Sequence, residues 1–126
     1  MKKALLLAFA LCVSGLAYAG EWADISIKDL KTAIAEKKVT LLDANGTDSY
    51  KDGHIPGAID FDAKVNTLTK LLPSDKNALV VAYCGGPACN AYEEAAEKAK
   101  ALGYTNIKHL SAGISGWKSA GETTEK

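Results

Sequence analysis

The sequence contains no arginine. All 15 basic residues of the 126-residue chain are lysine, and 15 acidic residues bring the formal net charge to zero. A bidentate guanidinium clamp on a phosphate or a carboxylate is therefore excluded. The lack of excess positive charge disfavours nucleic acid as a partner, because such binding rests on a basic surface. The hydrophobic content of 48% is that of an ordinary globular protein and excludes a disordered chain.

Long apolar runs are also scarce, and one of them lies at the N-terminus. Lysines at positions 2 and 3 precede an apolar run over residues 4–15. Ala17 and Ala19 then place small side chains at the two positions that a signal peptidase recognises. This three-part pattern predicts a secretory signal peptide over residues 1–19, and we therefore expect a periplasmic protein.

Two alternatives for this segment fit less well. A membrane anchor needs about 20 apolar residues, and the run is shorter than that. A lipoprotein would be modified at Cys12, but Leu11 stands where a small residue is expected. Cleavage after Ala19 leaves residues 20–126, which is the length of one compact domain. Its polar tail, residues 121–126, is expected to be frayed.

Helical periodicity and short apolar runs alternate along the predicted domain. The patterns predict helices over residues 25–37, 64–72, 88–102 and 114–120, a helical turn over 48–52, and strands over 39–44, 58–61, 78–83 and 106–110. This alternation indicates an α/β fold with a mainly parallel sheet covered by helices on both faces. The run over residues 78–83 is apolar throughout, as is typical of a central strand. Cys84 follows it directly, at the end of the sheet where such folds bind ligands.

Cysteine is scarce as well, because only Cys84 and Cys89 remain in the predicted domain. They enclose the sequence Gly-Gly-Pro-Ala. The two glycines allow the backbone to curl, so that successive N–H groups can point toward the sulfur of Cys84. Together with the N-terminus of the following helix, such a loop would stabilise a thiolate, which is the reactive form of cysteine.

Three other interpretations of the cysteines stay open at this point. Cys84 can be a buried structural thiol, which is a common fate of cysteine. In an exported protein Cys84 and Cys89 can also form a disulfide, and because it would close a short loop, a redox role suits it better than a stabilising one. A metal site formed with His54 and His109 matches no trusted zinc spacing, and we predict no metal.

Three segments resemble the signatures of the rhodanese family. The resemblance to the first signature lies in Leu41-Leu42-Asp43, Tyr50 and Gly53-His54-Ile55-Pro56-Gly57-Ala58. The resemblance to the active-site loop lies in Tyr83-Cys84 with its glycine loop. The resemblance to the C-terminal signature lies in Gly103-Tyr104 and Ala112-Gly113-Ile114-Ser115-Gly116-Trp117. The matches follow the order of the family and span residues 39–121. The hexapeptide 53–58 and the final Gly-Trp segment are the most specific of them.

The resemblance implies a rhodanese-like three-layer fold and sulfurtransferase activity. In this family a cysteine thiolate takes a sulfane sulfur from a donor such as thiosulfate, becomes a persulfide, and passes the sulfur to a thiophilic acceptor. The nucleophile implied for this chain is Cys84. The loop implied to hold the outer sulfur comprises Gly85, Gly86, Pro87, Ala88 and Cys89. No cofactor is implied, and the expected partners are a small donor (thiosulfate or polysulfide) and a thiophilic acceptor.

The absence of arginine is a departure from the family pattern. Many members carry an arginine after the strand that matches residues 41–44, where this chain has Asn45. Many also carry one late in the active-site loop. An anionic donor must therefore rely on backbone N–H groups and lysines, which puts thiosulfate activity in doubt. Phosphatase relatives hold phosphate with a loop arginine, so phosphatase activity is disfavoured.

The remaining polar residues are interpreted as structural. We expect Asp43 and His54 to fix the signature loop through hydrogen bonds rather than to act in catalysis. His109 is expected only to end a strand. Tyr92 is expected to lie on the surface of its helix.

Two further hypotheses compete with a sulfurtransferase. In the first, Cys89 is a resolving cysteine, and the pair forms a thiol–disulfide switch. In the second, the fold has lost its chemistry and serves as a binding module; Cys84 argues against this and the missing arginines argue for it. The small, nearly neutral domain is expected to be monomeric, and to have no membrane contact after cleavage.

Overall fold

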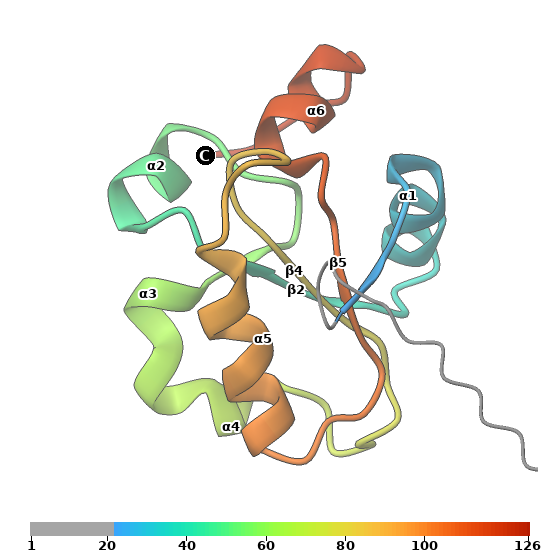
Figure 1. Cartoon of the computed structure of the whole chain (residues 1–126), viewed down its shortest axis with the longest axis vertical. Helices are drawn as coiled ribbons and strands as arrows, with labels where there is room; N and C mark the ends of the chain where they lie inside the picture. Colours follow the sequence, from blue (N-terminus) through green and yellow to red (C-terminus); the bar gives the residue numbers. More distant parts are fainter. Residues whose placement is uncertain (1–21) are drawn as a thin grey trace, which may run out of the picture.

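The fold is built on a five-stranded, fully parallel sheet (Figure 1). The computed structural model describes residues 22–126, so the expected signal peptide and Cys12 lie outside the described residues. The strands are β1 (Ala23–Asp24), β2 (Thr40–Asp43), β3 (Ile59–Asp60), β4 (Val80–Tyr83) and β5 (Ile107–His109). Their order across the sheet is β1-β5-β4-β2-β3, which places β4 at the centre. The predicted mixed α/β class and mainly parallel sheet are confirmed.

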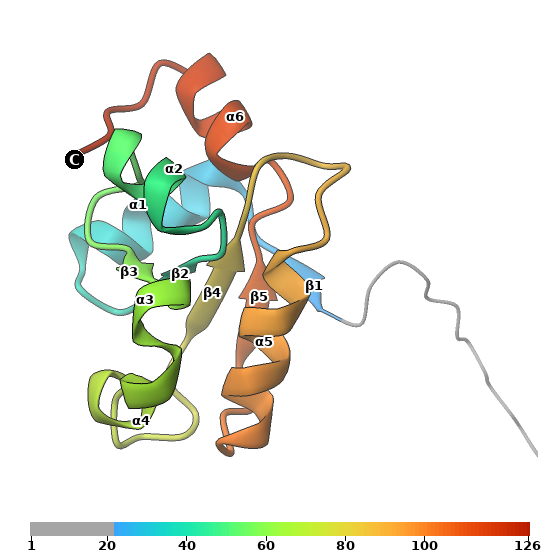
Figure 2. The same cartoon turned by 90° about the vertical axis from the view of Figure 1, so that its left-hand side faces the viewer.

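Helices cover both faces of the sheet and make a three-layer molecule (Figure 2). They are α1 (Ile27–Ala35), α2 (Thr47–Asp52), α3 (Phe61–Lys64), the 3₁₀ turn η1 (Val65–Thr67), α4 (Leu68–Leu71), α5 (Tyr92–Ala101) and α6 (Gly113–Ser119). The helices α3, α4 and α5 lie on one side of the sheet and α1 on the other (Figure 1). The α1 helix begins after a capping residue, since the Ser26 hydroxyl accepts a hydrogen bond from the Asp29 N–H at 3.0 Å.

The alternation of side chains along β4 divides the core into two clusters. Val80 and Ala82 face α5 and pack with its buried alanines, and Cys84 continues on that side. Val81 and Tyr83 point to the opposite face and pack with residues of α1 and α6. Because successive side chains of a strand alternate, the position of Cys84 on the α5 side follows from the register of β4.

The structure corrects two of the helix predictions. The helix predicted over residues 88–102 begins at Tyr92, because residues 86–89 form a turn in which the Cys89 N–H donates to the Gly86 carbonyl at 3.0 Å. The helix predicted over 64–72 is a broken series that begins earlier, at Phe61. Asp60 caps that start, since its carboxylate accepts a hydrogen bond from the Ala63 N–H.

The predicted strands agree with the structure better than the predicted helix ends, and they differ from it in two places. Phe61 belongs to α3 and is not the last residue of a strand. The short edge strand β1 was not predicted, because two residues carry no detectable period. Leu71, an apolar residue within the helix predicted over 64–72, is 44% exposed.

The C-terminal tail differs from the frayed segment that its polarity suggested. The backbone of Glu125 exchanges two hydrogen bonds with His54, both at 2.9 Å, in an antiparallel bridge. The Trp117 indole N–H donates to the Thr123 carbonyl at 2.7 Å. Lys31 forms an ion pair with Glu122 at 3.0 Å. The tail is therefore tied to the signature loop, to α6 and to α1.

Within residues 22–126, no helix combines the length and the apolar character that crossing a membrane requires.

Candidate functional site

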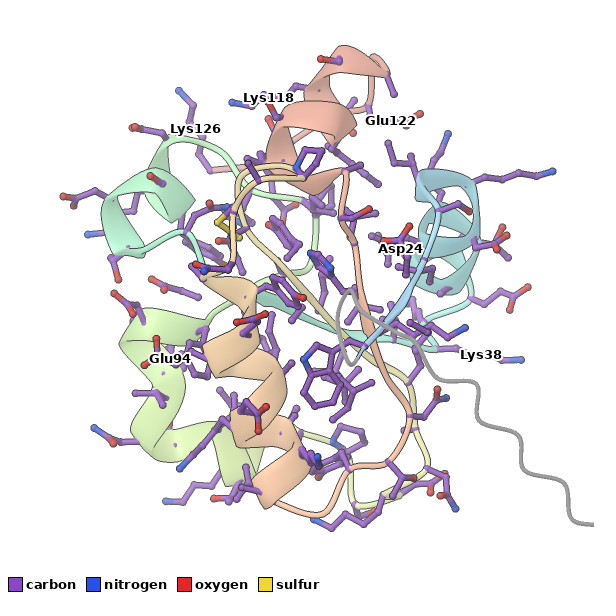
Figure 3. The ribbon with its side chains drawn as sticks, in the orientation of Figure 1. Asp24, Lys38, Glu94, Lys118, Glu122 and Lys126 are labelled. Atoms are coloured by element: carbon purple, nitrogen blue, oxygen red, sulfur yellow. A yellow bond between two sulfur atoms is a disulfide. The ribbon has the colours of Figure 1, made fainter. Side chains whose placement is uncertain are left out.

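Cys84 lies directly after the central strand and is joined to Cys89 by a disulfide. The Cα atoms of the two cysteines are 6.3 Å apart, and the bridge spans the loop between β4 and α5 (the yellow bond in Figure 3). Cys84 is only 1% exposed, whereas Cys89 is partly exposed. The sequence left several interpretations of the cysteines open, and in the structure Cys84 and Cys89 form a disulfide.

The C-terminal signature holds this loop in place. The Ile114 N–H donates to the Cys84 carbonyl, and the Ser115 N–H donates to the Gly85 carbonyl, each at 2.9 Å. Gly113 makes this contact possible, because a Cβ atom there would lie 2.5 Å from the Gly85 carbonyl carbon. Gly113 also has a positive φ of 64°, which favours glycine. Two segments of the sequence signature thus meet at the cysteine loop.

Backbone donors remain available around the disulfide. The Cys89 N–H is used within the turn, but no acceptor within residues 22–126 receives the N–H groups of Gly85, Gly86 or Ala88. These are the residues that the resemblance assigns to the outer sulfur. The α5 helix begins at Tyr92, and no side chain caps its N-terminus. The positive end of its dipole therefore lies close after the loop.

Asp43 and Tyr83 form a buried pair on the other face of the sheet. The Tyr83 hydroxyl donates to Asp43 Oδ2 at 2.6 Å and accepts from the Ile55 N–H at 3.1 Å. The Asn45 N–H donates to Asp43 Oδ1 at 2.8 Å. Burial raises the pKa of Asp43, and the hydrogen bonds from Tyr83 and Asn45 oppose that rise. Burial also raises the pKa of Tyr83, and the charge of Asp43 adds to the effect.

His54 is held inside the signature loop. Its ring stacks on Tyr50 at a centroid distance of 3.6 Å, and its Nδ1 lies 2.8 Å from the Tyr50 carbonyl, to which it donates. Its Nε2 lies 3.6 Å from Glu125 Oε2. The Tyr50 hydroxyl donates to the Ala58 carbonyl at 2.7 Å and closes the loop. His54 and Asp43 therefore contact the signature loop and its supports, and no contact described in the structure joins either of them to the cysteines.

A cleft of about 460 Å³ lies beside Cys89. Its walls come from the edge strand β1 with the residue before it, the cysteine loop, the start of α5 and the end of β5. The lining residues are Trp22, Asp24, Pro87, Ala88, Cys89, Asn90, Tyr92, Glu93, His109 and Ser111. The prediction for Tyr92 was wrong, whereas His109 ends β5 as predicted. Tyr92 is buried rather than on the helix surface, and His109 stacks on its ring at a centroid distance of 3.4 Å.

His109 is the least expected residue of the site. It is 9% exposed, and its Nε2 atom is buried with no hydrogen-bond partner in the described part of the chain. Burial lowers the pKa of His109, and the charges of Asp24 and Glu93 oppose that shift. The sequence held one signal for this pair: Tyr92 precedes Ala95 and Ala96 by three and four residues, which places it on the same buried helix face.

The four residues considered for a metal site are not assembled. Cys84 and Cys89 are bonded to each other, His54 is engaged by the signature loop, and His109 is stacked on Tyr92. Among residues 22–126 there is no group of three or more His, Cys, Asp or Glu side chains that could hold a metal ion.

The fold and the cysteine loop define a class of protein: an α/β domain with a cysteine at the carboxyl end of its central parallel strand. The sequence pattern of the Rhodanese-like domain matches residues 26–120. The chain therefore belongs to the rhodanese-like domain family.

The proteins to which this chain is similar include a transcriptional regulator and a solved structure. The chain is 35% identical over 85 residues to the HTH-type transcriptional regulator Rv0324 of Mycobacterium tuberculosis, covering 67% of this chain and 36% of the regulator. It thus spans about a third of that relative. Among solved structures, the BH2092 protein of Bacillus halodurans is 28% identical with a TM-score of 0.64, covering 82% of this chain and 76% of that one.

A third similar protein carries an enzyme name. The thiosulfate sulfurtransferase of Pseudomonas aeruginosa matches with a TM-score of 0.67 and 24% identity, covering 91% of this chain and 21% of that one. At this identity the likeness concerns the fold alone. Together with the family match, it makes the fold of this chain one of the sulfurtransferase type.

Proposed function

We propose that the protein is an exported sulfurtransferase or sulfur carrier that moves sulfane sulfur through a persulfide on Cys84. The position of Cys84 carries the proposal. The residue directly follows the central strand, and its loop presents the N–H groups of Gly85, Gly86 and Ala88 without acceptors within residues 22–126. Such donors suit a thiolate or a persulfide anion.

The proposed reaction has two balanced steps on the reduced protein. In the first, the Cys84 thiolate attacks the outer sulfur of a donor R–S–SH; a new S–S bond forms on Cys84, and R–S⁻ leaves. In the second, an acceptor thiolate attacks the outer sulfur of the Cys84 persulfide, and the Cys84 thiolate leaves. The loop from Gly85 to Cys89 holds the outer sulfur between the two steps.

The charges near the loop favour some donors over others. The chain has no guanidinium group, and Asp24 and Glu93 are the charged residues that line the cleft beside Cys89. A dianion such as thiosulfate is therefore a poor donor, whereas a persulfide or polysulfide of lower charge is a better one. The name of the Pseudomonas aeruginosa protein includes thiosulfate, but we do not propose thiosulfate as the donor for this chain.

The disulfide supports a second candidate function, a thiol–disulfide switch. Cys89 is close enough to bond to Cys84, as a resolving cysteine must be. In the balanced step, the Cys89 thiolate attacks the inner sulfur of the Cys84 persulfide, the disulfide forms, and hydrosulfide leaves. The two functions can therefore follow one another in one protein.

Intact mass spectrometry tests both functions. Protein without its leader is reduced, freed of reductant, treated with polysulfide or thiosulfate, and weighed beside C84S and C89S. A gain of one sulfur with polysulfide that reductant removes and that C84S abolishes supports transfer through Cys84. A longer-lived persulfide in C89S supports the resolving role. Unchanged mass in every sample would leave a binding module as the function.

The periplasmic location is part of the proposal and has its own test. The full chain is expressed in a bacterium, and the N-terminus of the periplasmic product is determined. We expect Gly20 as the first residue, because Ala17 and Ala19 fit the cleavage motif. Retention of residues 1–19 in the cytoplasmic fraction contradicts export.

A further inference from the structure

The two sulfurs of the disulfide differ in access. Cys84 is 1% exposed and packs in the core beneath α5. Cys89 is partly exposed and lines the cleft of about 460 Å³. A nucleophile that opens a disulfide must reach one of the two sulfurs, and access decides which one it attacks. In this loop the accessible cysteine is Cys89, which lines the cleft.

The cleft also contains a polar group with no protein partner. His109 lines the cleft and is 9% exposed, and its buried Nε2 makes no hydrogen bond within the described residues. Buried polar atoms are nearly always satisfied, so an orphan of this kind indicates an absent polar occupant. A ligand that carries a hydrogen-bond donor or acceptor into the cleft would satisfy it.

The walls of the cleft indicate the charge of that ligand. Asp24 and Glu93 are acidic, and Trp22 and Tyr92 are aromatic. Asp24 uses one carboxylate oxygen to accept from the Ser111 N–H at 2.8 Å. The two carboxylates favour a cation and repel an anion. A small thiol with an ammonium group therefore fits the cleft better than a small thiol with a carboxylate group.

We propose that this cleft is the docking site of a small cationic aminothiol, which attacks Cys89 Sγ and opens the disulfide. The step is balanced: R–SH loses its proton to solvent, its thiolate bonds to Cys89 Sγ, the Cys84–Cys89 bond breaks, and Cys84 leaves as a thiolate. The products are a mixed disulfide on Cys89 and a free Cys84 thiolate. The proposal concerns the oxidised protein and does not depend on persulfide transfer.

The leaving group explains why this direction is chemically favourable. A thiol of lower pKa leaves faster in disulfide exchange. The departing Cys84 sulfur belongs to the loop whose Gly85 and Gly86 N–H groups have no acceptor within residues 22–126. These donors stabilise the thiolate that forms. Attack on Cys89 thus releases Cys84 in the form that sulfur chemistry requires.

Peptide mapping tests the direction of attack. Oxidised protein is mixed with less than one equivalent of cysteamine, quenched with acid, alkylated in denaturant and digested at lysine. Residues 77–98 form one peptide with both cysteines, and cleavage before Pro87 in the mass spectrometer separates them. We expect cysteamine on Cys89 and the alkyl group on Cys84. The reverse placement, or an equal distribution, overturns the proposal.

Reaction rates test the charge preference. The rates at which cysteamine and 3-mercaptopropionate open the disulfide of the oxidised protein are compared. Each rate is divided by the rate of the same thiol with hydroxyethyl disulfide, which removes the difference in intrinsic reactivity between the two thiols. We expect the normalised rate of cysteamine to be higher, and E93Q to reduce its advantage about two- to fivefold. E97Q is the matched control, since Glu97 lies on the same helix but not in the cleft. Equal normalised rates, or equal effects of the two variants, overturn the proposal.

Replacement of His109 completes the test. H109F keeps a planar ring against Tyr92 and removes Nε2. We expect the cysteamine rate to fall at least about threefold, the loss of one modest hydrogen bond, with 3-mercaptopropionate less affected. An unchanged cysteamine rate in a folded H109F protein removes His109 from the site. Because no sulfur donor is present, failure here leaves the persulfide proposal to its own mass measurement.

Discussion

At the scale of single residues, His109 shows how a binding feature can work against stability. Its Nε2 is buried without a hydrogen-bond partner in the described part of the chain, although the ring is well packed against Tyr92. Leaving a buried polar atom unsatisfied costs about 1–3 kcal/mol. A sequence that served only the fold would place an apolar ring at this position. The polar atom is therefore better explained by a ligand than by folding.

A stability measurement follows from this cost. H109F removes the unsatisfied atom and keeps the stacked ring, so we expect the free energy of unfolding to rise by about 1 kcal/mol or more. Urea denaturation followed by circular dichroism measures it. The control is Y92A, which removes the ring on which His109 stacks and is expected to destabilise the protein. A less stable H109F would mean that Nε2 already has a partner, such as a bound water.

The buried pair of Asp43 and Tyr83 predicts a dependence of stability on pH. The folded-state pKa of Asp43 is raised above its ordinary value of 3.8, chiefly by burial. Between these two pKa values the folded state binds more protons than the unfolded state. The contribution of Asp43 therefore decreases as pH rises through this window, and it is most favourable below 3.8.

Unfolding of the wild type and D43N across this pH range isolates the effect. We expect the free energy difference, wild type minus D43N, to fall as pH rises, and to level off above the folded-state pKa of Asp43. A difference that rises with pH would mean that the hydrogen bonds from Tyr83 and Asn45 outweigh burial. That result would reverse the direction of the shift.

At the scale of elements, the junction of the cysteine loop with α6 depends on one glycine. Gly113 combines a φ of 64° with a backbone contact that leaves no room for a Cβ atom, 2.5 Å from the Gly85 carbonyl carbon. Gly121 has a φ of 81° but open space around it. The two positions share the backbone conformation and differ in crowding. They form a matched pair for mutagenesis.

We expect G121A to cost about 1–2 kcal/mol, the strain of a side chain in the left-handed region. G113A should cost at least about 2 kcal/mol more, because the cysteine loop must also move away from the new methyl group. Urea denaturation gives the costs. The rate of Cys84 alkylation in the reduced proteins gives a second signal, which should rise in G113A alone. Equal costs with unchanged alkylation would contradict the close contact.

The elements also show what the sequence could predict and what it could not. The apolar run of residues 78–83 identified the central strand, and the three signature segments identified the fold. The start of α5 was placed too early, because the turn from Gly86 to Cys89 and the disulfide keep this segment out of the helix. The cleft was missed for a similar reason, since β1 and α5 bring Asp24 and Glu93 together from distant positions.

At the scale of the whole molecule, the two sides of the sheet carry different features. The α5 side carries the cysteine loop and the cleft. The opposite side carries the signature loop around His54, which the C-terminal tail supports. Polarity alone suggested a frayed tail, because the two backbone hydrogen bonds with His54 cannot be foreseen from composition. The tail is instead part of the support of the fold.

Removal of the tail should therefore weaken one side of the molecule more than the other. A chain that ends at Gly121 loses the Thr123 carbonyl that accepts from Trp117, the backbone bridge to His54 and the Glu125 carboxylate that accepts from Gly57. At roughly 1 kcal/mol for each hydrogen bond, the expected loss is about 2–4 kcal/mol. Deletion of Lys126 alone is the control, because none of these bonds involves it.

Hydrogen exchange separates a local effect from a general one. In the truncated chain we expect the amides of His54 and Gly57 to exchange much faster, because both lose their acceptors on Glu125. The amides of Ile114 and Ser115, which donate to the cysteine loop, should change only by the amount of the global loss. If both sets accelerate equally, the tail supports the fold as a whole and the two sides of the sheet are one cooperative unit.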